Sequence, residues 1–141
     1  MTPEEKARQK IDQWFTDAGW EVINRDDYEP TCTAVAIREG LLKGNLEADY
    51  FLFINGKAVG VLEANAFSSI VCEQAALYAR SVPNIYQTYQ KPLPFIFTSN
   101  GKELYFCDFR EQDHYFKQIM TIPTPHELVK KLGINDYFAG L

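Results

Sequence analysis

The pattern of apolar and polar positions predicts an α/β domain organised around one hairpin. One apolar run spans residues 49–54, a second spans residues 58–62, and Asn55-Gly56 stands between them. Asn-Gly is the strongest short-range signal for a two-residue hairpin turn, because both turn positions need a positive φ angle. The first run is apolar at nearly every position, which is typical of an interior strand that is covered on both faces.

Periodic patterns predict helices and further strands around this hairpin. Thr2-Pro3-Glu4-Glu5 combines an N-cap, a proline at the first helical position and a capping-box acid, and Thr124-Pro125-His126-Glu127 repeats this pattern. The expected helices cover residues 2–18, 68–82 and 124–132, and the expected strands cover 20–24, 33–38, 49–54, 58–62, 93–98 and 103–109. Residues 38–44 are expected to form a turn-rich connection, and Asn100-Gly101 a second hairpin turn. Strand pairs joined by helices favour a central mixed sheet with helices on both faces, in which the helix over 68–82 is a crossover.

Two acids stand at the ends of the hairpin. Asp49 opens the first strand and Glu63 closes the second. In an antiparallel pair with a two-residue turn, these two positions lie close together at the open end. Two neighbouring carboxylates repel each other unless one takes a proton or a cation lies between them. Mg²⁺ suits such oxygen ligands and needs only one or two carboxylates. Spacing alone also allows a plainer interpretation, in which both acids are solvated strand ends.

The predicted helix over 68–82 brings a second pair of polar residues together. Gln74 and Tyr78 are four residues apart and therefore share one side of the helix. An apolar stripe on the same side is expected to face the sheet. The pair is either a packing contact whose tyrosine hydroxyl finds some partner, or a part of the site at the two acids.

Taken together, these residues resemble the nuclease motif of the PD-(D/E)XK superfamily. More narrowly, the chain resembles the N-terminal domain of the restriction (R) subunit of type I restriction-modification enzymes. The family pattern is an Asp on one strand, Glu-x-Lys at the end of the next, and Gln-x-x-x-Tyr on the following helix. The matching segments here are Asp49, Glu63-Ala64-Asn65 and Gln74-Ala75-Ala76-Leu77-Tyr78. The likeness extends upstream to residues 2–8 and 18–20.

The resemblance implies a restriction-endonuclease-like fold and Mg²⁺-dependent cleavage of DNA phosphodiester bonds. Asp49, Glu63 and the backbone carbonyl of Ala64 would hold the metal. Asn65 stands where the family carries its lysine, and the segment from Asn65 to Cys72 is a few residues shorter than in the family. Because asparagine carries no charge, we expect little or no cleavage. The supporting or DNA-proximal positions implied by the resemblance are Glu5, Gln74 and Tyr78, although Glu5 is first of all a capping-box residue.

The resemblance also implies partners. Residues 1–141 would form a single nuclease domain at the N-terminus of a longer subunit, and residues 136–141 resemble the segment that leads toward its motor domains. The chain has no G-x-x-x-x-G-K-[ST] phosphate loop, so ATP would act only through motor domains outside this chain. The expected partners are DNA, these motor domains, and the modification and specificity subunits. The net charge of −5 argues against tight DNA binding by this domain alone.

Composition narrows the cellular setting. Hydrophobic residues make up 46% of the chain, yet no apolar run reaches membrane-spanning length, and the N-terminus carries no secretory signal. Cys32, Cys72 and Cys107 are widely spaced and fit reduced thiols, and His114 and His126 also lack ligand spacing. These features predict a cytoplasmic protein without a membrane partner.

Two alternatives remain open at this level. The domain could be a non-catalytic unit that docks partner subunits or holds DNA within a restriction complex. It could also be an unrelated α/β protein, in which case Asp49 and Glu63 should lie far apart or be exposed.

Overall fold

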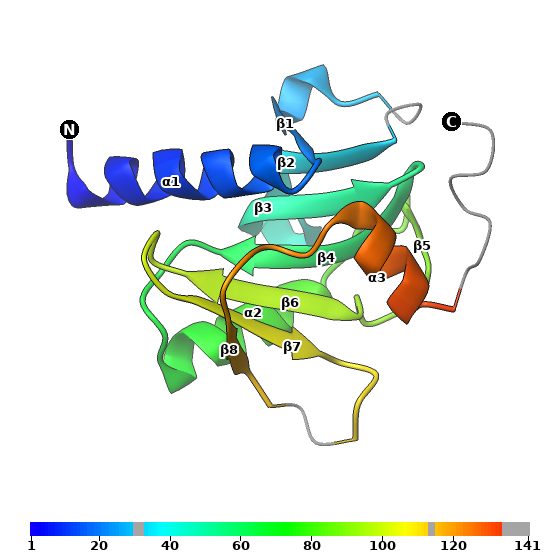
Figure 1. Cartoon of the computed structure of the whole chain (residues 1–141). Coiled ribbons are helices and arrows are strands. Elements are labelled where there is room, and N and C mark those ends of the chain that lie inside the picture. Colours follow the sequence, from blue (N-terminus) through cyan, green and yellow to red (C-terminus); the bar gives the residue numbers. More distant parts are fainter. Residues whose placement is uncertain (30–32, 113–114, 134–141) are drawn as a thin grey trace.

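A mixed β-sheet runs through the centre of the molecule, as the computed structural model shows for residues 1–29, 33–112 and 115–133 (Figure 1). The described residues form eight strands in the order β1-β2-β3-β4-β6-β7-β8, with β5 pairing with β4 outside this path. The strands are β1 (Glu21–Asn24), β2 (Ala34–Leu41), β3 (Glu47–Ile54), β4 (Lys57–Glu63), β5 (Gln87–Thr88), β6 (Phe95–Ser99), β7 (Leu104–Asp108) and β8 (Lys117–Ile119). The helices are α1 (Pro3–Asp17), α2 (Ser69–Ala79) and α3 (Pro125–Lys131), with 3-10 turns at Arg25–Asp27 and Lys43–Asn45.

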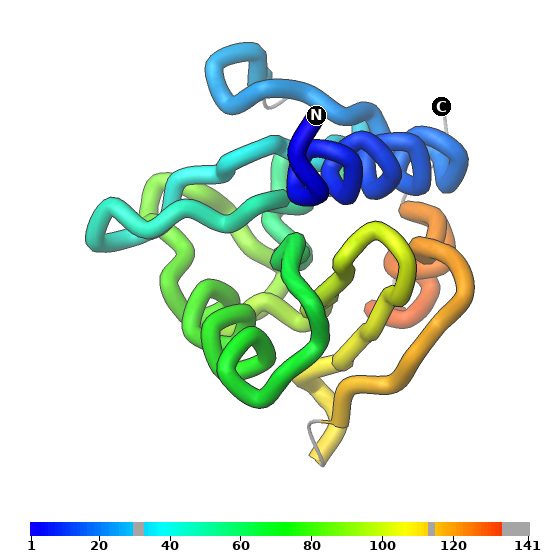
Figure 2. Tube along the Cα trace, turned by 90° about the vertical axis from the view of Figure 1, so that its left-hand side faces the viewer, coloured from blue at the N-terminus to red at the C-terminus, as the bar shows by residue number. Residues whose placement is uncertain are grey.

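The hairpin forms as predicted. Strands β3 and β4 pair in antiparallel fashion, and Ile54 lies opposite Lys57 across the Asn55-Gly56 turn, whose φ angles are 47° and 79°. Lys57 is therefore at the far end of the hairpin from Glu63. At the open end, where β3 starts and β4 ends, the hairpin lies on the same side of the molecule as the start of α1 (Figure 2).

Strand β4 lies beside β6 in parallel orientation, with Glu63 opposite Thr98. Helix α2 lies between these two strands in the sequence and is the crossover that the sequence predicts. The register places Glu63 and Thr98 side by side on the same face of the sheet, because paired residues in a sheet point their side chains the same way.

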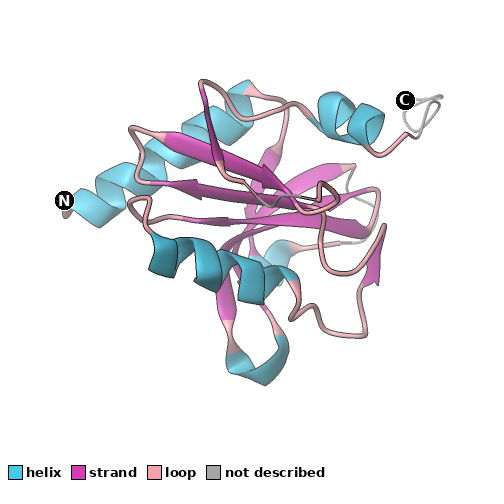
Figure 3. Cartoon of the chain, turned by 90° about the horizontal axis from the view of Figure 1, so that it is seen from below, coloured by secondary structure: helices cyan, strands magenta, loops and turns pink. Residues whose placement is uncertain are grey.

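Helices cover both faces of the sheet. Ile11 and Phe15 of α1 and Leu128 of α3 pack in one buried cluster on one face. Ala75 and Tyr78 of α2 belong to a second cluster on the opposite face. Figure 3 shows α2 on the other side of the strands from α1. The expected fold class, a central mixed sheet flanked by helices, is confirmed.

Helix starts follow the predicted caps. The side-chain oxygens of Thr2, Ser68 and Thr124 accept hydrogen bonds from the backbone N–H groups of Glu5, Val71 and Glu127, at 3.1, 3.2 and 3.1 Å. Helix α2 ends at Ala79, three residues before its expected end, with Arg80 as its C-cap.

Strand β2 differs from the prediction. The sequence predicts a turn from Arg38 onward, whereas β2 continues to Leu41 and pairs Gly40 with Ala48. Glu39 adopts a positive φ of 55°, so the strand passes through a local irregularity and then resumes pairing. Strands β5 and β8 were not predicted, because two or three residues are too few to show an alternating pattern.

Some sequence-based expectations fall on residues that the structure does not describe, namely Cys32, His114 and residues 136–141. Among the helices of the described residues, none combines the length and the apolar character that a bilayer crossing requires.

Candidate active site at the open end of the hairpin

The two acids of the hairpin meet at its open end. Asp49 lies on β3 and Glu63 is the last residue of β4. The backbone N–H of Asp49 donates to Oε1 of Glu63 at 3.4 Å. Glu63 is only 3% exposed. The structure therefore brings the acids together as the hairpin geometry predicts, and the interpretation of Glu63 as a solvated strand end is wrong.

The surroundings of Glu63 favour the protonated form of its carboxyl group. Burial, and after it the negative charge of Asp49, raises the pKa of Glu63 to about 8. Both causes act in the same direction, because a low-dielectric site and a like charge each disfavour a second carboxylate. Uptake of a proton, one of the two ways to relieve the repulsion between the acids, is thus favoured at Glu63.

The other way, a cation, is realised on Asp49. The guanidinium of Arg8 on α1 forms a close ion pair with Oδ1 of Asp49. The backbone N–H of Ala64 donates to Oδ2 of Asp49 at 2.7 Å. Burial alone would lower the pKa of Arg8, but the charge of Asp49 and the hydrogen bond to it, together with Tyr50 and Glu39, raise this pKa above its ordinary value.

Arg8 has no role in the sequence-based prediction, which includes it only in the stretch of upstream likeness. A signal for it did exist in the helical spacing. Arg8 precedes the buried Ile11 and Phe15 by three and seven residues, so it lies on the sheet-facing side of α1. A charged residue on that side must find a buried or half-buried partner.

A hydrogen-bond network fixes α1 beside the acids. The hydroxyl of Tyr50, the residue after Asp49, donates to Oδ1 of Asp12 at 2.6 Å and lies 3.2 Å from the carbonyl oxygen of Arg8. Asp12 also pairs with Arg38 of β2 at 2.8 Å. Burial and the contact with Asp12 raise the pKa of Tyr50 well above its ordinary value, so its hydroxyl remains a donor.

Tyr78 of α2 is a neighbour of the acids on the opposite face of the sheet from α1, and Gln74 is its hydrogen-bond partner. The side-chain amide of Gln74 donates to the hydroxyl of Tyr78 at 2.8 Å. Tyr78 is buried. Burial, then the charge of Glu63, raises the pKa of Tyr78. Tyr78 is thus both a packing residue and an electrostatic neighbour of Glu63.

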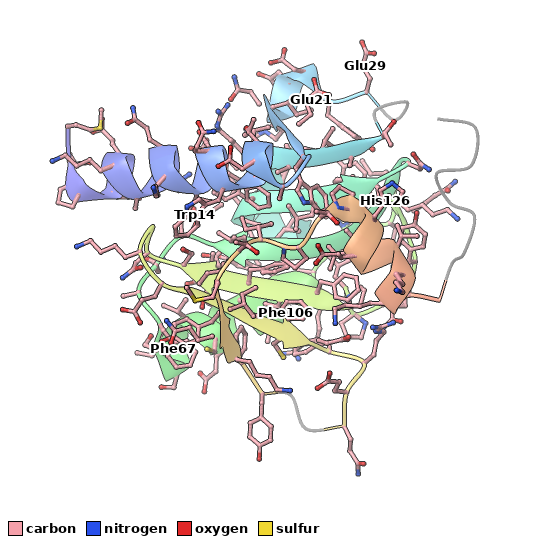
Figure 4. The ribbon with its side chains drawn as sticks, viewed as in Figure 1. Trp14, Glu21, Glu29, Phe67, Phe106 and His126 are labelled. Carbon is pink, nitrogen blue, oxygen red and sulfur yellow. The ribbon has the colours of Figure 1, made fainter. Side chains whose placement is uncertain are left out.

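The other predicted positions lie at the edge of the site. Asn65 is exposed in the segment that follows β4. Two residues later, Phe67, which is labelled in Figure 4, stacks on Tyr105 of β7 with ring centroids 4.0 Å apart and holds this segment against the sheet. Glu5 is exposed, and its Oε1 accepts a hydrogen bond from the hydroxyl of the N-cap residue Thr2 at 3.1 Å.

Thr98 is a further neighbour that sequence reasoning missed. It lies opposite Glu63 on β6 and is completely buried. Its hydroxyl has no hydrogen-bond partner among the described residues. Only the register of β4 against β6 identifies it, and no local pattern encodes that register.

The oxygen donors at this site fit a small hard cation. Asp49, Glu63 and the backbone carbonyl of Ala64 offer the ligand type that Mg²⁺ prefers, and Mg²⁺ keeps several of its waters. Within the described part of the chain, no group of three or more His, Cys, Asp or Glu residues could hold a metal ion. A cation bound here would rely on two carboxylates and would compete with a proton at Glu63 and with the guanidinium of Arg8 at Asp49.

Comparisons with known proteins agree with this geometry. No curated protein sequence matches the chain. A structure described as a fragment of the HsdR subunit of a type I restriction enzyme from Vibrio vulnificus YJ016 has a TM-score of 0.58 at 22% identity. The match covers 94% of this chain and 25% of that chain, so the present chain spans about a quarter of that length. At this identity the likeness shows the fold alone.

A family model gives the stronger result. The model described as "Type I restriction enzyme R protein N terminus" matches residues 35–115, which is more than half of the chain and includes Asp49, Glu63 and Tyr78. Arg8 and Glu5 lie outside the matched range. The sheet, the acid pair at the hairpin end and this match agree, and the chain belongs to the family of type I restriction enzyme R protein N-terminal domains.

Proposed function

We propose that the chain is the metal-dependent nuclease domain of a type I restriction enzyme R subunit and that it acts on DNA phosphodiester bonds. The observation that carries the proposal is the contact between Asp49 and the buried Glu63 at the open end of the hairpin. A buried acid pair is costly unless a cation or a proton accompanies it. Membership of the R-subunit family supports DNA as the substrate.

The proposed metal ligands are Asp49, Glu63 and the carbonyl of Ala64. Bound Mg²⁺ would polarise the scissile phosphate and lower the pKa of a coordinated water. Tyr78 and Gln74 border the acids on the α2 side, where the tyrosine hydroxyl can orient a neighbouring polar group. The burial of Glu63 and Tyr78 keeps water away from one side of the pair.

Asn65 limits the proposed activity. It is exposed and can donate a hydrogen bond to a phosphate oxygen, but it has no charge to offset the charge of the transition state. The loss of one electrostatic donor typically costs about 10²–10³ in rate. We therefore expect metal binding with little or no cleavage.

Two measurements test the proposal in sequence. Calorimetric titration with Mg²⁺ or Mn²⁺ should show binding to the chain and none to Asp49→Ala. Asn65→Lys should then nick supercoiled DNA at least tenfold faster than the unchanged chain, and Asp49→Ala/Asn65→Lys is the matched control. Absence of metal binding in the unchanged chain and in variants at Arg8 would reject the metal-dependent nuclease.

A second candidate function has its own support. Both carboxylate oxygens of Asp49 already have partners, Arg8 on one and the N–H of Ala64 on the other. Together with the neutral Asn65, this arrangement favours a non-catalytic domain that holds DNA or docks the motor domains or the modification and specificity subunits. A site that binds no metal in any variant would make this the better proposal.

In either role the domain would act as part of a larger cytoplasmic assembly. The related HsdR fragment is about four times as long as the part of it that this chain matches. ATP-dependent motor domains would belong to such an additional part.

A further inference from the structure

We propose that Arg8 sets the metal affinity of the site. Its guanidinium is an internal counter-ion of Asp49, and a divalent cation must displace it in order to bind. The inference rests on the proposed metal site and adds to it a positioning residue from α1. Arg8 lies outside residues 35–115, the range that the family model matches.

Both carboxylate oxygens of Asp49 already have a partner. Its Oδ1 pairs with the guanidinium of Arg8 and its Oδ2 accepts from the N–H of Ala64. The side chains of Arg8 and Asp49 are only 27% and 19% exposed, so solvent screens the ion pair weakly. A metal ion that takes an oxygen of Asp49 must therefore break an existing charge-assisted contact.

The position of Arg8 on α1 does not depend on its ion pair with Asp49. Ile11 and Phe15 fix α1 on the sheet by complete burial. The hydroxyl of Tyr50 lies 3.2 Å from the carbonyl oxygen of Arg8, and Asp12, one turn further on, accepts from both Tyr50 and Arg38. The backbone of Arg8 is thus held by neighbours that do not depend on the ion pair. Its side chain can leave Asp49 while α1 stays in place.

Competition between two cations for one carboxylate has two linked consequences. Without Arg8, the metal-free protein keeps an acid pair that has lost its counter-ion, so it should be less stable. The same protein should bind a divalent cation more tightly, because nothing must be displaced. By thermodynamic linkage, the added metal should then raise the melting temperature more than it does in the unchanged chain. A merely structural ion pair predicts only the loss of stability.

The test uses Arg8→Gln, Arg8→Lys and a matched control, Lys10→Gln. Lys10 is on the same helix and lies over the ring of Trp14 at 5.9 Å, so its loss removes one positive charge without touching Asp49. Calorimetry with Mg²⁺ and Mn²⁺ gives the dissociation constants. Thermal unfolding with and without metal gives the shift in melting temperature, and circular dichroism confirms that each variant is folded.

We expect Arg8→Gln to lower the metal dissociation constant roughly tenfold, the range of one charge-assisted hydrogen bond. Its melting temperature should fall without metal and rise most on metal addition. Arg8→Lys keeps the charge but lacks the planar guanidinium, so its metal affinity should lie between those of the unchanged chain and Arg8→Gln. If Arg8→Gln does not fold, Arg8→Lys provides the test. Lys10→Gln should change the dissociation constant by no more than about twofold, as expected for a distant screened charge.

The outcomes separate the two proposals. Equal affinity in Arg8→Gln and the unchanged chain overturns the role of Arg8 and leaves the metal site standing. An equal gain in Lys10→Gln also overturns it, since general charge then explains the effect. Binding in Arg8→Gln but not in the unchanged chain supports the role of Arg8 and overturns the expectation that the unchanged chain binds the metal. No binding in any variant overturns both.

Discussion

Glu63 shows how far burial can change one side chain. Its pKa is raised to about 8 by burial and by Asp49, whereas its ordinary value is 4.5. Between these two values the folded protein holds a proton that the unfolded chain has lost. The free energy of unfolding must therefore decrease as the pH rises from about 4.5 to about 8.

Glu63→Gln should remove this pH dependence, because glutamine imitates the neutral acid. Melting temperatures of both proteins between pH 5 and pH 9 provide the measurement. The unchanged chain should lose stability relative to the variant as the pH rises, with most of the difference present by pH 8. Parallel pH profiles would show that Glu63 is already ionised in the folded protein at low pH.

Thr98 offers a second prediction for a single residue. A buried hydroxyl without a partner carries a desolvation cost, and valine keeps nearly the same shape without that group. Thr98→Val should therefore raise the free energy of unfolding by about 1 kcal/mol. Urea denaturation measures the change, and Thr98→Ser, which keeps the hydroxyl but loses a methyl group, should be destabilised. A destabilised Thr98→Val would mean that the hydroxyl is hydrogen-bonded in solution.

Among elements, the contact of β4 with β6 decides the geometry of the site. Gly60 allows this contact, because a Cβ atom there would lie 2.3 Å from the carbonyl oxygen of Phe95. A side chain at this position would push the two strands apart. Glu63 and Thr98 lie further along the same pair of strands, so they would move with them.

Gly60→Ala should lower the free energy of unfolding by about 1–3 kcal/mol or more, the usual cost of overpacking. It should also weaken metal binding, because Glu63 is displaced. Gly44→Ala is the control: it carries a positive φ of 70°, but its added methyl group would meet nothing within 4 Å. Denaturation and calorimetry on both variants provide the measurement. For Gly44→Ala they should show only the loss of stability that backbone strain causes, without a change in metal affinity. Unchanged metal affinity in Gly60→Ala would contradict the coupling of strand spacing to the site.

The elements also show where sequence reasoning succeeds. The Asn55-Gly56 turn and the caps at Thr2 and Thr124 were predicted, because each depends on residues that are neighbours in the sequence. The extension of β2 past Glu39 was missed. Its pairing with β3 outweighs the local turn signal, and such pairing is a tertiary effect.

At the scale of the whole molecule, helices on opposite faces of the sheet both contribute to the site. Helix α1 supplies Arg8 on one face, α2 supplies Tyr78 on the other, and the hairpin end lies between them. With a net charge of −5, such a domain cannot draw DNA by bulk attraction, so the proposed substrate would have to be presented by a larger assembly. Membership of the R-subunit family is consistent with that arrangement.

The sequence by itself determined the fold class, the hairpin, the helix starts and the meeting of Asp49 with Glu63. These features follow from residue spacing, since a two-residue turn fixes which strand ends face each other. Only the tertiary structure showed that Arg8 pairs with Asp49, 41 residues away, and that Thr98 lies beside Glu63. Such contacts depend on how α1 and β6 pack against the hairpin, and packing joins residues that no local pattern connects. The raised pKa of Glu63 has the same origin, because burial is a property of the folded molecule.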